Sequence, residues 1–79
     1  MRAFILMKVE SGKEDEVFSK VIEHEKIKRV LEVLGPYDMV VEAEIASEKE
    51  LEEVVITFLR GLEGVKDTIT LVVMKEQSK

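Results

Sequence analysis

The sequence predicts an α+β fold in which two helices cover one face of a four-stranded antiparallel sheet. Two observations support this prediction: four short segments are rich in β-branched and apolar residues, and two others carry apolar residues at helical spacing. The order is β-α-β-β-α-β, which is the ferredoxin-like arrangement with right-handed crossovers. The 79 residues suffice for one small domain, so we expect a single domain over 1–79 with a polar tail at 75–79.

The first half of the chain predicts a strand, a helix and a second strand. Residues 3–9 are nearly all apolar, as is typical of a strand covered on both faces. Ser11 and Glu14 have the spacing of a capping box, so we expect a helix to begin there and to fade around 24–26. A strand should follow at 27–34. The apolar stripe of the helix consists of Val17, Phe18, Val21 and Ile22, and Phe18 and Phe58 are expected in the core.

The second half begins with a turn at Gly35 and Pro36, since proline lacks a backbone N–H and fixes φ. A third strand is expected at 38–45 and a fourth at 66–74. Between them, a second capping box at 47–50 should begin a helix that ends near Gly61 and Gly64. Its apolar residues recur at helical spacing: Leu51, Val54, Val55, Phe58, Leu59 and Leu62.

Alternation along the strands assigns side chains to the two faces of the sheet. We assign one wholly apolar set to the helix side: Ala3, Ile5, Met7, Val9, Met39, Val41, Ala43, Ile45, Ile69, Leu71 and Val73. The opposite set is mixed: Phe4, Leu6, Lys8, Asp38, Val40, Glu42, Glu44, Thr68, Thr70, Val72 and Met74. This uncovered face is too apolar for a solvated surface. We therefore expect a second copy to pack against it, giving a two-fold, α+β barrel-like dimer.

Composition argues against several classes of function. The net charge of −5 and the lack of a basic stripe disfavour direct nucleic-acid binding. There is no cysteine, and the single histidine, His24, does not make a metal site, so we expect neither disulfide, metal nor cofactor. The apolar run at 3–9 is too short to span a membrane, and we expect a soluble cytoplasmic protein.

A candidate ligand site lies at the turn. Tyr37 and Asp38 follow it directly, and Thr68 and Thr70 lie two apart on the last strand, where their hydroxyls share a face. In the expected register that face is also the face of Asp38. A carboxylate, two hydroxyls and turn backbone groups would hold a small zwitterion. Two plainer interpretations stay open: Asp38 accepts a backbone N–H, and the threonines are ordinary strand residues.

The element order, the "GPYD" at 35–38 and the "TIT" at 68–70 resemble the effector-binding and assembly (RAM) domain of the Lrp/AsnC family. The resemblance covers essentially the whole chain. It implies that the turn lies between dimers and binds a free amino acid. By this resemblance Gly35 would allow close backbone approach, Tyr37 and Asp38 would contact the ligand, and Thr68 and Thr70 would complete the pocket. Dimers would assemble into octamers or similar rings.

Full-length members of that family carry an N-terminal helix-turn-helix domain, whereas here the first strand begins at residue 2 or 3. The sequence therefore resembles the stand-alone form, which would act through a small molecule or by co-assembly with full-length regulators. Two alternatives remain: a small dimeric ferredoxin-like enzyme of the oxygenase or isomerase type, and a purely structural oligomer. The lack of cysteine and the peripheral histidine disfavour the enzyme. The identity of the amino acid is not specified by the sequence.

Overall fold

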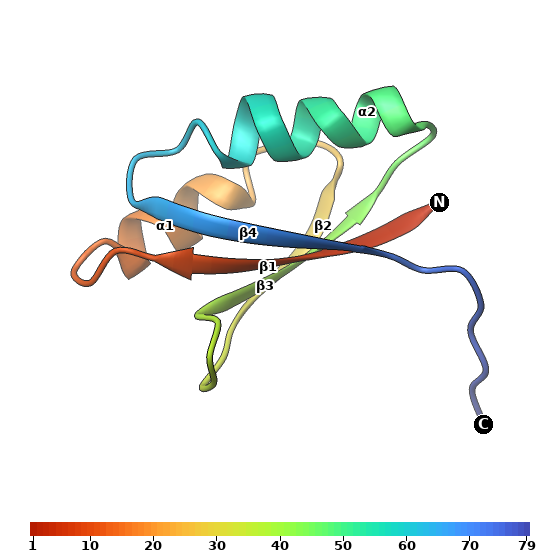
Figure 1. The fold of residues 1–79 in the computed structure, drawn as a ribbon, viewed down its shortest axis with the longest axis horizontal. Helices are drawn as coiled ribbons and strands as arrows, with labels where there is room; N and C mark the ends of the chain where they lie inside the picture. The colour runs from red at the N-terminus through yellow and green to blue at the C-terminus, as the bar shows by residue number, and fades with distance from the viewer.

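The computed structural model describes residues 1–79 and confirms the predicted fold class and element order (Figure 1). The sheet is antiparallel throughout, with strand order β2-β3-β1-β4, and the helices lie on one side of it. No helix has the length and apolar character needed to cross a membrane. The elements are β1 (Arg2–Val9), α1 (Glu14–Val21), β2 (Ile27–Glu32), β3 (Met39–Glu44), α2 (Glu48–Glu52), the π-helix η1 (Glu53–Leu59) and β4 (Val65–Val72).

The predicted capping box at Ser11 is wrong. Gly12, with φ of +91°, forms a turn closed by the Lys13 N–H donating to the Glu10 carbonyl at 2.9 Å. Ser11 therefore lies within the turn, and Lys13 occupies the N-cap position without a side-chain capping bond. The Glu14 carboxylate instead accepts from the Gly12 N–H at 2.8 Å. Acidic side chains in the first turn still favour this helix end through the helix dipole.

The second helix begins as predicted but changes its winding. The Ser47 hydroxyl accepts from the Glu50 N–H at 3.2 Å, while the Glu50 carboxylate accepts from the Ala46 N–H at 3.0 Å. After five α-helical residues the chain continues as the π-helix η1. Its last turn is closed by the Arg60 N–H, which donates to the Val55 carbonyl at 2.9 Å. A π-helix of seven residues is unusual, because this winding mostly occurs as single turns.

The core lies between the helices and the sheet. It is built from fourteen hydrophobic residues: Ala3, Ile5, Met7, Val9, Val17, Val21, Ile27, Met39, Val41, Ala43, Ile45, Val54, Val55 and Leu59. The predicted core position of Phe18 is wrong, since its side chain is 37% exposed, whereas Phe58 packs partly buried against the core. The reason is that α1 packs beside the edge strand β2. There Phe18 and Ile22 line an open cavity of about 590 Å³ together with Leu31.

The face assignment is correct for β1 and β3 but wrong for β4. Directly paired residues of antiparallel strands share a face, and Thr68 lies opposite the buried Met7 while Leu71 lies opposite Phe4. Thr68, Thr70 and Val72 therefore face the helical side, and Ile69 and Leu71 face away from it. Both alternating sets of this strand contain apolar residues, so alternation alone could not decide which set is turned inward.

The side of the sheet away from the helices is more apolar than predicted. We call it the open face, and its apolar residues come from all four strands: Phe4, Leu6, Leu31, Val40, Ile69 and Leu71. Ile69 is 41% and Leu71 49% exposed. The β2–β3 loop projects away from the helical layer on this side of the sheet (Figure 1).

Candidate functional site

Asp38 joins the ends of three strands. Its backbone N–H donates to the Met7 carbonyl at 2.9 Å, and its carbonyl accepts from the Val33 N–H at 2.9 Å. Its side-chain Oδ2 accepts from the Val9 N–H at 2.8 Å, which confirms the plainer interpretation that Asp38 caps a backbone group. The second carboxylate oxygen, Oδ1, forms no hydrogen bond within the chain. Asp38 therefore fixes the loop and still offers one anionic oxygen.

The rest of the β2–β3 loop is exposed. The ammonium of Lys8 lies 5.5 Å from the centroid of the half-buried Tyr37 ring, a cation–π contact that holds the ring beside β1. Gly35 has no positive φ, and a Cβ built on it would meet no atom within 4 Å. Leu34 at the tip is fully exposed. The fold of a single chain therefore does not require glycine at position 35.

Thr68 and Thr70 lie on the helical side of β4. Thr68 is only 8% exposed, and its Oγ1 accepts from the Nε of Arg60 at 3.0 Å. The Thr68 N–H donates to Oδ1 of Asp67 at 2.9 Å. The exposed Thr70 hydroxyl has no partner in the chain. A cavity of about 220 Å³ adjoins Thr68 and is lined by Arg60, Val65, Lys66, Asp67 and Thr68.

The structure does not bring Asp38 and the two threonines together. Met7 on β1 separates the two positions. Asp38 donates its N–H to the Met7 carbonyl from the side of β1 where β3 lies, whereas Thr68 pairs with Met7 on the other side, where β4 lies. Two interstrand spacings, about 10 Å, separate these positions. The threonines also face the helical side, so the predicted shared face with Asp38 is wrong. The predicted site residues therefore fall into two separate groups. We call them the loop half-site (Gly35, Tyr37 and Asp38) and the strand half-site (Thr68 and Thr70).

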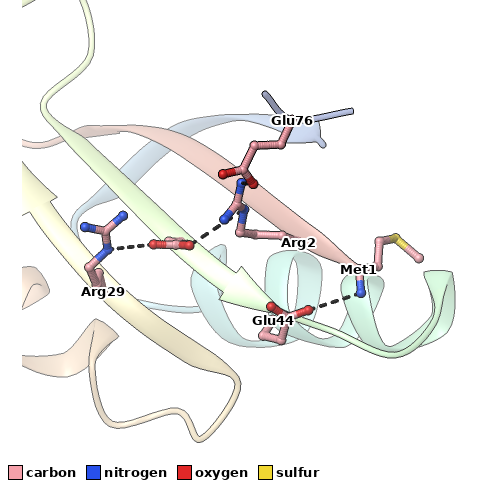
Figure 2. A network of polar contacts seen from close by, with 6 residues as sticks. Met1, Arg2, Arg29, Glu44 and Glu76 are labelled. Atoms are coloured by element: carbon pink, nitrogen blue, oxygen red, sulfur yellow. Dashed lines mark hydrogen bonds and ion pairs between the residues drawn. The ribbon is translucent and has the colours of Figure 1, made fainter. Parts of the chain in front are cut away.

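A network of charged side chains crosses the open face (Figure 2). The Nε of Arg29 donates to Glu42 at 2.6 Å, and the Nε of Arg2 lies 3.8 Å from the other Glu42 oxygen. Arg2 also pairs with Glu76 and lies 5.6 Å from the Phe4 ring centroid. Both arginines of this face are therefore neutralised by carboxylates. Arg60 does not belong to this network, because its Nε donates to Thr68 of the strand half-site. The sequence did not single it out, since only the fold brings Arg60 next to Thr68.

Comparison with known sequences gives a match over nearly the whole chain. Residues 2–79 match the family model described as the Lrp/AsnC ligand binding domain. The HTH-type transcriptional regulator FL11 of Pyrococcus furiosus is 41% identical over 73 residues, which is 92% of this chain and 48% of that protein. FL11 of Pyrococcus abyssi is 40% identical over 75 residues, covering 95% and 49% of the two chains. The chain spans about half the length of the curated relatives it matches.

Several solved structures share both the fold and the chain length. FFRP-DM1 is 32% identical with a TM-score of 0.88, covering 92% of this chain and 97% of that one. A hypothetical protein of Pyrococcus horikoshii is 32% identical with a TM-score of 0.86, covering 95% and 90%. A protein of Thermus thermophilus is 28% identical with a TM-score of 0.93, covering 99% and 98%.

Proposed function

Because this chain belongs to the Lrp/AsnC ligand-binding domain family, we propose that it binds a free amino acid at a site completed by a second copy of itself. The observation that carries the proposal is the placement of two polar half-sites on opposite faces of one chain, each with an unused hydrogen-bonding group. The family is a ligand-binding domain and not an enzyme family. The oxygenase or isomerase alternative is therefore set aside.

The open face supplies the first level of assembly. Its apolar residues come from all four strands and include the exposed Ile69 and Leu71. A patch of this kind on a 79-residue chain is typical of an interface rather than of a solvated surface. Packing two such faces would bury about 600–800 Å² per partner, the usual size of a stable interface. We propose that this packing forms the dimer.

Pairs of dimers then supply the complete site. The β2–β3 loop extends beyond the sheet and carries the fully exposed Leu34 at its tip. We propose that it lies at the edge of the dimer and remains accessible there. There the loop half-site of one copy can meet the strand half-site of another. The Asp38 carboxylate would accept the ammonium of the amino acid, and the threonine hydroxyls would donate to its carboxylate. We propose that repeating this contact assembles the dimers into an octamer or similar ring.

A regulatory role follows if the same contact forms with a longer relative. The matched FL11 regulators are about twice as long as this chain and share this domain with it. We propose that the chain co-assembles with such regulators and alters their response to the amino acid. Co-purification with a regulator of this type from the native source would support the proposal. Recovery of homo-oligomers alone would reduce the function to ligand binding.

A thermal-shift screen against the twenty amino acids tests the binding site. We expect one or a few to raise the melting temperature, since a ligand at 100 times its Kd stabilises a protein by about 2.7 kcal/mol. Asp38→Asn should remove most of the shift, because asparagine still accepts from the Val9 N–H but loses the negative charge. Thr70→Val should weaken the shift by loss of one hydroxyl without a change of shape. Thr57→Val, at an exposed position of η1, is the matched control.

Three outcomes of the screen are distinct. Stabilisation that disappears in Asp38→Asn and persists in Thr57→Val supports the proposed site. Absence of stabilisation by every amino acid would favour the purely structural oligomer. Equal stabilisation of the wild type and both site variants would mean that the amino acid binds elsewhere on the chain.

A further inference from the structure

We infer that Arg60, held in place by Thr68, binds the carboxylate of the amino acid and is the main determinant of anion recognition in the strand half-site. This inference rests on the proposed function and adds to it a residue that the sequence did not single out. The cavity of about 220 Å³ beside Thr68 provides the location, and Arg60 forms part of its wall. Its volume lies below the ~300–1,000 Å³ of drug-sized pockets and suits a small metabolite.

The hydrogen bonds of Arg60 leave its terminal nitrogens unused. Only its Nε has a partner, the Oγ1 of Thr68 at 3.0 Å. The other two arginines, Arg2 and Arg29, both pair with glutamates. Arg60 therefore stays unpaired in a chain that has 17 acidic residues. Its fork of terminal N–H groups matches the two oxygens of a carboxylate better than any other side chain does.

Thr68 adds a donor at the same place. A hydroxyl has one proton to donate and two lone pairs that accept. The Nε of Arg60 occupies one lone pair, so the hydroxyl proton remains available, and no acceptor within the chain takes it. Thr68 is the one polar residue that is buried in the fold, and its side chain borders the cavity. A ligand oxygen in the cavity would satisfy this donor and the guanidinium together.

The charges around the cavity favour an anion. Arg60 and Lys66 contribute two positive charges to the wall, and Asp67 contributes one negative charge. The Oδ1 of Asp67 already accepts from the Thr68 backbone N–H, which partly satisfies that carboxylate. The wall thus has a net positive charge in a chain whose formal net charge is −5. The wall of this cavity therefore attracts oxygen anions.

The backbone fixes Arg60 at a defined position. Its N–H donates to the Val55 carbonyl in the wide last turn of η1, and the next residue, Gly61, donates to the Phe58 carbonyl at 3.2 Å. A Cβ on Gly61 would lie 2.7 Å from the Thr57 carbonyl oxygen, so the chain turns tightly at this point. A binding group held by a helix end in this way is positioned more firmly than one on a flexible loop.

Isothermal titration calorimetry with two matched ligands tests the inference. The probes are the amino acid that gives the largest thermal shift with the wild type and the α-amide of the same amino acid, which lacks the carboxylate. We expect the amide to bind at least tenfold more weakly. Arg60→Gln should weaken binding of the amino acid by about 10- to 100-fold, the range of a charge-assisted hydrogen bond, and Arg60→Lys by less. Lys28→Gln removes one exposed, unpaired positive charge elsewhere and should leave binding unchanged.

The possible failures are separable. If the amide binds as tightly as the amino acid, or Arg60→Gln binds as the wild type does, the inference is wrong while the proposed function stands. If Arg60→Gln instead lowers the assembly mass measured by light scattering and leaves affinity per site unchanged, Arg60 pairs with a carboxylate of a neighbouring copy, and the inference is again wrong. If no amino acid binds the wild type, the proposed function fails and the inference fails with it.

Discussion

Leu71→Lys should raise the dissociation constant of the dimer by about 1,000-fold or more. Leu71 lies on the open face opposite Phe4 and is 49% exposed in a single chain. The substitution therefore disturbs the fold of one chain little, but it places an unpaired ammonium inside the proposed interface. Loss of a buried anchor typically weakens an interface by about 2 kcal/mol, and two-fold symmetry applies the loss twice. Sedimentation equilibrium over a range of concentrations measures the change.

A control variant distinguishes disruption of the interface from a general effect of adding a lysine to the surface. Ile56 is a similarly exposed aliphatic residue, but it lies on η1 at the helical side of the molecule. Ile56→Lys should leave the dimer intact at the concentration where Leu71→Lys dissociates. Circular dichroism at the same concentration reports whether each variant is folded. A dimer of wild-type strength in Leu71→Lys would show that the open face is not the interface.

Gly64→Ala should lower the free energy of unfolding by about 2–5 kcal/mol. Gly64 has φ of +99°, a conformation that disfavours a residue with a Cβ by about 1–2 kcal/mol. The added Cβ would also lie 2.8 Å from the Cβ of Lys13 and 3.2 Å from a methyl group of Val17. These atoms belong to the start of α1, so the helix must shift, and overpacking of this kind costs about 1–3 kcal/mol.

Gly12→Ala is the control for backbone conformation alone. Gly12 has φ of +91°, but a Cβ there would meet no atom within 4 Å. The Gly12→Ala variant should therefore lose only about 1–2 kcal/mol of its free energy of unfolding, which is the cost of the backbone conformation alone. Urea unfolding at one fixed protein concentration measures both variants, because the proposed dimer would make stability depend on concentration. Equal losses in the two variants would show that the contact between Gly64 and α1 does not contribute.

The position of Lys13 beside Gly64 is also held by charge. Its ammonium hydrogen-bonds to Glu63 at 3.3 Å. This bond, with the negative charges of Glu63 and Glu16, raises the pKa of Lys13 above its usual value. The Lys13 side chain therefore links Glu63, in the segment before β4, to the start of α1.

The fold was predictable because local signals agree with the tertiary structure. The alternation in β1 and β3 places Ile5 and Val41 in the core, where the structure has them. The apolar period of the second helix predicts its buried side correctly, although no sequence signal indicated the π-helical winding of η1. The capping-box prediction at Ser11 failed although the spacing between Ser11 and Glu14 fits that motif. Gly12, which lies between them with a positive φ, forms a different turn.

The candidate site was predictable only in part. The sequence singled out the loop after Pro36 because a tyrosine and an aspartate follow a turn that needs neither. In the structure, Asp38 joins the ends of three strands. The face of the sheet on which the threonines lie was predicted wrongly. The edge strand β4 has apolar residues in both alternating sets, so only its pairing with β1 decides which set faces the helices. Arg60 lies eight residues from Thr68, and only the end of η1 brings them together.

A subunit-mixing experiment tests most directly the central claim that two copies complete each site. Asp38→Asn and Thr70→Val chains are unfolded and refolded together in equal amounts. We expect about a quarter of the sites to regain wild-type affinity. In a random assembly, half of the loop half-sites come from Thr70→Val chains and are intact, and half of the strand half-sites come from Asp38→Asn chains and are intact. Calorimetric stoichiometry for the best amino acid measures this fraction. If the mixture recovers no wild-type sites, each site is built within one chain and the account is contradicted.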